Sequence, residues 1–86
     1  MACRKRVGLA GGFVVEVRRA RKQYSCFYCR RPILPSEHYV VIRAVGGNAS
    51  RYHPQCFNTL IPHRLRVVHT AVGPCLESVL EDDSVL

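Results

Sequence analysis

Two short stretches decide how this chain folds: CFYC at residues 26–29 and HPQC at residues 53–56. Each stretch places two metal-binding side chains three positions apart, and 23 residues (30–52) separate the two stretches. Structural zinc sites take four tetrahedral ligands, and three thiolates with one imidazole are an established set. The spacing therefore predicts one closed structural Zn²⁺ site whose ligands are Cys26, Cys29, His53 and Cys56.

The five cysteines have other interpretations, and these account for less of the pattern. A redox C-x-x-C needs a βαβ context, which the sequence does not offer. Unrelated buried thiols beside a surface histidine are a second alternative. The odd cysteine count argues against a closed disulfide framework. We interpret Cys3 as part of a mobile tail and Cys75 as a core residue, neither of them a ligand.

A metal ion would also compensate for the small size of the chain. Its 86 residues, with a mass of 9.7 kDa, allow a single domain whose core is marginal. The hydrophobic fraction of 48% excludes a disordered polar tail. Structural zinc contributes roughly 10–16 kcal/mol in small fingers, so the metal-free chain is expected to be loose or unfolded.

Local patterns predict the elements around the site. The β-branched stretch 13–19 and the stretch 38–45 are typical of strands. Gly46-Gly47-Asn48 indicates a hairpin turn, residues 49–52 form the return strand, and residues 53–60 form a short helix. The order is a zinc knuckle at residues 26–29, a β-hairpin, and a helix that carries the second ligand pair. This order predicts a small α+β fold of the treble-clef zinc-finger type with a further C-terminal helix.

The chain divides into three parts by composition. Residues 1–12 are expected to be a flexible basic tail, and residues 13–73 the zinc-finger domain, with an extended segment near 65–68. Residues 74–86 are expected to be an acidic amphipathic helix, over 75–82, followed by a tail. The helix is predicted from three apolar residues at helical spacing, Leu76, Val79 and Leu80.

The charge of the chain points to a polyanionic partner. Thirteen Lys and Arg residues oppose six Asp and Glu residues, for a net charge of +7, and eleven of the thirteen are Arg. Arg forms bidentate contacts with phosphate and stacks on bases, which favours nucleic acid. Tyr24, Phe27 and Tyr28 lie among these cations and can stack on unpaired bases, although Phe27 can instead pack over the metal site. The predicted contacts are Arg18, Arg19, Arg21, Lys22, Arg30, Arg31, Arg43, Arg51, Arg64 and Arg66.

The stretch from Ser25 to Phe57 resembles the zinc finger of poly(ADP-ribose) polymerase type. That finger has C-x2-C, an Ile a few residues later, a β-hairpin, and an aromatic residue before H-x2-C-F. The four ligands match, as do its hydrophobic positions, here Ile33, Tyr52 and Phe57. Because fingers of that family recognise DNA breaks, the resemblance implies binding to DNA. The first half of a LIM domain, a module that mostly binds proteins, is similar as well, but Cys56 is not followed by the second C-x2-C of a full LIM domain.

Two functions follow as hypotheses. The first is a zinc-stabilised module that binds DNA or RNA through an Arg-rich face. The alternative is an adaptor or inhibitor that docks on a partner protein. No Ser/His/Asp set, glycine-rich phosphate loop or open metal site is present in the sequence, so we do not expect an enzyme or a small-molecule substrate. We expect an intracellular location, in the cytoplasm or nucleus (of the host cell if the chain is viral), with no membrane partner.

Overall fold

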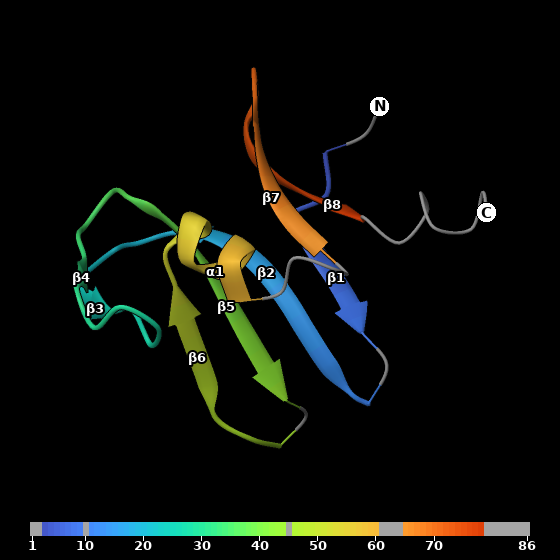
Figure 1. Ribbon diagram of the computed structural model, residues 1–86, viewed down its shortest axis with the longest axis horizontal. Coiled ribbons are helices and arrows are strands. Elements are labelled where there is room, and N and C mark those ends of the chain that lie inside the picture. The colour runs from blue at the N-terminus through green and yellow to red at the C-terminus, as the bar shows by residue number, and fades with distance from the viewer. Residues whose placement is uncertain (1–2, 10, 45, 61–64, 79–86) are drawn as a thin grey trace.

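The computed structural model describes residues 3–9, 11–44, 46–60 and 65–78. Within these ranges the chain forms eight short strands, arranged in three antiparallel sheets, and one short helix (Figure 1). The fold class is therefore α+β, as the sequence predicts. A four-stranded sheet forms the centre, a small two-stranded sheet lies at one end, and a two-stranded hairpin lies at the other.

The central sheet has the strand order β1-β2-β5-β6. Strand β1 is Arg6–Leu9, β2 is Phe13–Arg19, β5 is His38–Ala44 and β6 is Ala49–Tyr52. Every neighbouring pair is antiparallel. The strands predicted at 13–19, 38–45 and 49–52 are confirmed over their described residues. Their β-branched residues favour strands because they suit a pleated, half-buried surface.

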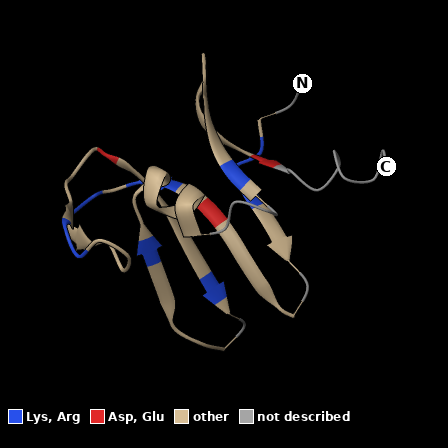
Figure 2. Ribbon diagram, viewed as in Figure 1, with Lys and Arg blue, Asp and Glu red and all other residues tan. Residues whose placement is uncertain are grey.

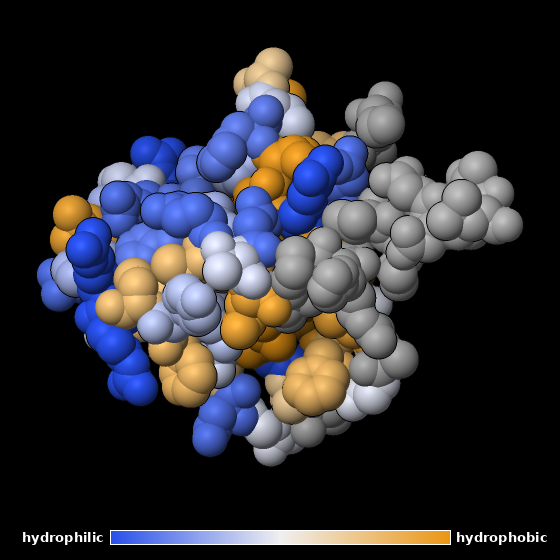
Figure 3. Space-filling model, in the orientation of Figure 1, coloured by the Kyte–Doolittle hydropathy of each residue, from blue (hydrophilic) through white to orange (hydrophobic). Residues whose placement is uncertain are grey.

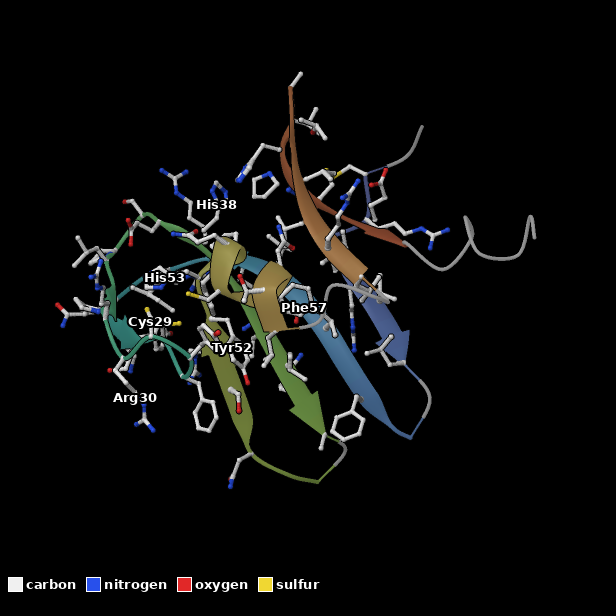
Figure 4. All side chains as sticks on the ribbon, in the orientation of Figure 1. Cys29, Arg30, His38, Tyr52, His53 and Phe57 are labelled. Atoms are coloured by element: carbon white, nitrogen blue, oxygen red, sulfur yellow. A yellow bond between two sulfur atoms is a disulfide. The ribbon has the colours of Figure 1, made fainter. Side chains whose placement is uncertain are left out.

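One face of the central sheet forms the main part of the core. Val15, Val17 and Val40 lie on this face and are at most 5% exposed. Helix α1, Pro54–Leu60, contacts β5 and β7, and it contributes Phe57, whose side chain is fully buried (Figure 4). The helix predicted over 53–60 is thus confirmed to within one residue, and its aromatic residue closes the core over the strands.

Strands β7 (Leu65–Thr70) and β8 (Gly73–Ser78) form the terminal hairpin, in which Val67 is opposite Leu76. Asn58 of α1 fastens this hairpin to the helix. The Val67 N–H donates to Asn58 Oδ1 at 2.7 Å, and Asn58 Nδ2 donates to the Val67 carbonyl at 3.1 Å. A single side chain therefore satisfies both backbone groups of one strand residue.

The helix predicted over 75–82 is wrong over its described part, because residues 75–78 belong to strand β8. Cys75 and Leu76 are consecutive and each is only 4% exposed. Strand neighbours point to opposite faces, so β8 is covered on both sides, and such a strand lacks the alternation that would identify it in the sequence. Residues 79–82 of the predicted helix lie outside the described residues.

The flexible tail expected at residues 1–12 is also corrected over residues 3–9. Strand β1 pairs with β2, and Cys3 forms a disulfide with Cys75, 72 positions away. The Leu76 N–H donates to the Arg4 carbonyl at 2.8 Å, and Lys5 Nζ donates to the Pro74 carbonyl at 2.6 Å. Residues 3–5 therefore join the central sheet to the terminal hairpin. Cys3 is not a bystander in a mobile segment, while Cys75 is buried as expected.

Candidate metal centre and surrounding basic surface

The knuckle, residues 26–29, is a tight turn between strands β3 (Tyr24–Ser25) and β4 (Pro32–Ile33). The Cys26 N–H donates to the Arg31 carbonyl at 2.9 Å, and the Arg30 N–H donates back to the Cys26 carbonyl at 3.0 Å. Arg30 has a φ of 67°, in the left-handed region that reverses the chain direction. These bonds place Cys26 and Cys29 on the same side of the turn.

The second ligand pair is positioned by the sheet and by the start of the helix. The Phe27 N–H donates to the Arg51 carbonyl at 2.8 Å, which docks the knuckle on the outer edge of β6. Strand β6 leads directly to His53, whose carbonyl accepts from the Phe57 N–H at 2.9 Å and so begins helix α1. Cys56 lies in the first turn of that helix, which aims its sulfur back toward the knuckle.

The four predicted ligands come together. The ligand atoms of Cys26, Cys29, His53 and Cys56 all lie within 4.8 Å of one another. Cys29 Sγ is 3.4 Å from His53 Nδ1, and Figure 4 shows these two side chains close together while Arg30 points away from them. The cluster can hold a metal ion, which confirms that the two stretches quoted from the sequence meet at one site.

The histidine is oriented for this role by a second contact. His53 Nε2 lies 3.1 Å from the Pro32 carbonyl oxygen. Because a carbonyl can only accept, Nε2 must carry the ring proton, and Nδ1 keeps its lone pair facing the three sulfurs. Fixing the tautomer through the remote ring nitrogen is the usual arrangement around metal-bound histidines. The donor set and its orientation therefore fit a metal ion bound through Nδ1.

The thiols of the cluster differ in pKa. Burial acts to raise the pKa of Cys26, but the backbone N–H groups of Cys29, His53 and Tyr28 outweigh burial and lower the pKa to about 6. Burial raises the pKa of Cys56, and hydrogen bonds with Cys29 and Cys26 raise it further, to about 12. One sulfur is thus prepared as a thiolate, whereas Cys56 keeps its proton until an ion displaces it.

The basic residues predicted to contact nucleic acid do not form one continuous face (Figure 2). The largest concentration lies beside the knuckle, in a groove of about 760 Å³ that we call the basic groove. It is lined by Arg18, Arg19, Ala20, Arg21, Tyr24 and Tyr39. Lys22 lies nearby, with its Nζ 5.8 Å from the centre of the Tyr24 ring. The predicted cluster at 18–22 therefore lies in and beside the basic groove.

The other predicted contacts lie away from the basic groove or outside the described residues. Arg43 binds Glu16 at 3.0 Å on the outer face of the sheet, where Arg18 contacts the same carboxylate at 3.4 Å. Arg66 pairs with Glu77 at 3.5 Å on the terminal hairpin, away from the knuckle. Arg30 and Arg31 are exposed just after the knuckle. Arg64 lies outside the described residues.

Arg51 has a structural role that the sequence does not reveal. Its guanidinium carbon lies 4.3 Å from the centre of the Tyr24 ring, while the Tyr39 ring is 5.3 Å from the same centre. The Nε of Arg51 is buried and has no hydrogen-bond partner among the described residues. Arg51 is thus half-buried and stacked against Tyr24. The β5–β6 register pairs Arg51 with Val41 and so sets the face of the sheet on which its side chain lies.

The aromatic residues near the knuckle separate into two kinds. Tyr24 is half-buried beneath Arg51, and Tyr39 is 3% exposed. Phe27 and Tyr28 are 59% and 50% exposed, although Phe27 touches Tyr52 edge-on with ring centres 6.0 Å apart. Phe27 is therefore largely at the surface, not buried over the metal site. In the space-filling view, hydrophilic side chains cover most of this end of the molecule (Figure 3).

Comparison of the chain with protein-family models, with curated proteins and with solved structures yields no match. Among the described residues, no helix is both long and apolar enough to cross a membrane. A function for this chain must therefore be inferred from the four-ligand cluster and from the charged surface beside it.

Proposed function

We propose that this chain is a zinc-stabilised treble-clef module that binds nucleic acid through the basic groove. The single observation that carries the proposal is the groove itself, a hollow of about 760 Å³ whose lining includes three arginines and two tyrosines. Nucleic acid presents phosphates at regular spacing along its backbone, and guanidinium groups recognise phosphate with paired N–H donors. The resemblance of residues 25–57 to fingers that recognise DNA breaks points in the same direction.

The charges in the groove support binding of an external anion. Arg19 and Arg21 are exposed and make no ion pair within the described ranges. Arg18 shares the carboxylate of Glu16 with Arg43 and so is only partly neutralised. Residues 1–73 contain all thirteen Lys and Arg residues but only two acidic residues, Glu16 and Glu37, so this part of the chain has a charge of +11. A polyanion would therefore be attracted to this protein.

The metal ion has a structural part in this proposal. Three thiolates and one imidazole suit zinc, whose bonds to sulfur and nitrogen favour tetrahedral sites. All four positions would be filled by the protein, which leaves no open position for a reacting water. The ion would join the knuckle, the β5–β6 hairpin and helix α1, the three parts of a treble clef. It would thereby hold Tyr24 and the cluster at 18–22 beside one another.

The test is the salt dependence of binding. Fluorescence anisotropy with a labelled 20-nucleotide single strand and with the corresponding duplex should give dissociation constants that rise steeply with salt. The slope of the logarithm of the association constant against the logarithm of the salt concentration should be roughly −0.7 to −0.9 per phosphate contacted. Exchanging Arg19 and Arg21 for alanine should weaken binding to both probes and reduce the magnitude of the slope by about 1.4 for the single strand and about 1.8 for the duplex. The control is Arg4→Ala, which removes one exposed arginine at the far end of the molecule and should leave the slope unchanged.

Two outcomes would count against the proposal. If neither DNA nor RNA binds at low salt, the groove does not serve nucleic acid. If a stoichiometric protein partner co-purifies and survives nuclease treatment, and Arg19→Ala disrupts that complex, the adaptor hypothesis replaces it. Metal analysis of the native protein tests the zinc assignment separately, with one ion per chain expected.

A further inference from the structure

The knuckle carries exposed aromatic side chains that neither the metal site nor the core uses. Phe27 and Tyr28 occupy the two positions between the ligands Cys26 and Cys29, and they are 59% and 50% exposed. Consecutive aromatic residues at this exposure are costly to leave in water, since each ring could bury well over a hundred square ångströms. The core of the described chain already has its aromatic residues in Tyr39, Tyr52 and Phe57.

Cations flank these two rings. The guanidinium carbon of Arg30 lies 5.6 Å from the centre of the Phe27 ring. Arg31 is exposed next to it, and neither arginine makes an ion pair in the described part of the chain. Arg30 also adopts a φ of 67°, a conformation in which glycine would be less strained than arginine. The presence of arginine there suits a charge requirement better than a backbone requirement.

The position of Phe27 is fixed before any ligand arrives. Its backbone N–H is bonded to the Arg51 carbonyl at 2.8 Å, and its ring rests edge-on against the buried Tyr52. An ion bound at Cys26 and Cys29 would hold both ends of the turn. An aromatic ring already held in place loses little conformational entropy when a second ring stacks on it.

We propose that the knuckle tip, defined as Phe27, Tyr28, Arg30 and Arg31, stacks on unpaired bases of single-stranded nucleic acid. This inference rests on the proposed function and names its substrate class. Bases in a duplex already stack on their neighbours, so an exposed ring gains most from bases that are unpaired. Arg30 and Arg31 can neutralise phosphates of the same strand. Tyr24 and Tyr39 cannot serve in this way, because Arg51 covers the first and the second is buried.

The main test compares variants on two probes. Phe27→Ala and Tyr28→Ala should each weaken binding of a 12-nucleotide single strand by roughly 5- to 150-fold, the range for one base–aromatic stack. Binding of a duplex of the same sequence should change by less than about twofold. The matched control is Phe13→Ala, which removes an aromatic ring of similar exposure (44%). Phe13 begins β2, at the end of that strand away from Arg19 and the basic groove, so its loss should affect neither probe. Thermal melting and metal content establish that each variant is folded.

A second variant keeps the test decisive should a truncation unfold the turn. The chain has no tryptophan, so Phe27→Trp introduces a single indole reporter at the knuckle tip. Its fluorescence should be strongly quenched by the single strand and little affected by the duplex. Arg30→Gly, which relieves the backbone strain, should bind metal as the wild type does and yet lose single-strand affinity.

The two proposals can fail separately. If both probes bind with equal affinity, Phe27→Ala changes nothing and the indole is not quenched, the stacking role is overturned while the basic groove stands. If neither probe binds the wild-type protein, the proposed function itself fails and the stacking role fails with it.

Discussion

The disulfide between Cys3 and Cys75 allows a quantitative prediction. Reducing it releases a loop that spans 72 positions. The crosslink removes loop-closure entropy worth about 4.4 kcal/mol at 25 °C from the unfolded chain, and reduction returns this entropy and so destabilises the fold. An unfolding entropy of about 2.1 cal/mol/K per residue gives roughly 0.18 kcal/mol/K for this chain. The melting temperature should therefore fall by about 24 °C.

The assay is thermal melting followed by circular dichroism, with and without a phosphine reductant. Cys3→Ser is the better variant because Cys3 is only half-buried, whereas Cys75 is 4% exposed and serine there would add a buried hydroxyl. The variant should melt where the reduced wild type melts and should be insensitive to reductant. A wild-type melt that ignores the reductant would refute the reasoning. So would a Cys3→Ser protein that loses as much stability on reduction, since the reductant would then be acting at the metal cluster.

The same experiment has a local readout. The Val17 N–H donates to the Lys5 carbonyl at 2.8 Å, and the Leu76 N–H donates to the Arg4 carbonyl at the same distance. Both bonds depend on residues that the disulfide tethers. Hydrogen exchange at Val17 and Leu76 should accelerate on reduction more than exchange at Cys26, whose N–H is bonded within the knuckle at the opposite end.

Three further predictions concern the cluster and its supports. Cys29→Ser should abolish stoichiometric metal binding, measured by elemental analysis, and the cooperative melting transition, measured by calorimetry. Gln55→Ala, which changes an exposed residue between two ligands, should keep both properties. Metal affinity should rise with pH, because the thiol of Cys56, with its pKa raised to about 12, must lose its proton on binding. Competition titrations between pH 6 and 8 that gave a flat profile would contradict this. Asn58→Ala should cost about 2–3 kcal/mol in urea denaturation, because both backbone groups of Val67 lose their partner. Asn58→Asp, which can still accept from the Val67 N–H, should cost less.

The sequence was most informative where the chemistry is local. The C-x2-C and H-x2-C spacings predict which four side chains meet, because a two-residue gap lets one turn direct both donors to the same point. The β-branched run of β2 and the glycine turn between β5 and β6 likewise determine their own conformations. Gly46, with a φ of 71°, supplies the left-handed residue that this turn requires.

The features that were missed depend on partners far away in the chain. Nothing near Cys75 indicates that Cys3 approaches it, and the apolar spacing around Leu76 fits one turn of helix as well as a strand covered on both faces. Strand β1 has only a weak signal in the sequence. Val7 and Leu9 alternate with exposed residues, and the Gly11-Gly12 pair that follows, with φ of 87° and 82°, is typical of a hairpin turn.

The two hydrogen bonds between Asn58 and Val67 also protect the terminal hairpin against self-association. A two-stranded hairpin has two open edges, and unpaired backbone groups along an edge invite another chain to add a strand. Asn58 occupies the edge of β7 at Val67, and the Arg4 carbonyl occupies the edge of β8 at Leu76. At Val67 and Leu76, therefore, neither edge of the hairpin can accept a strand from another chain. This would hinder fibril-like association of a small β-rich protein in concentrated solution.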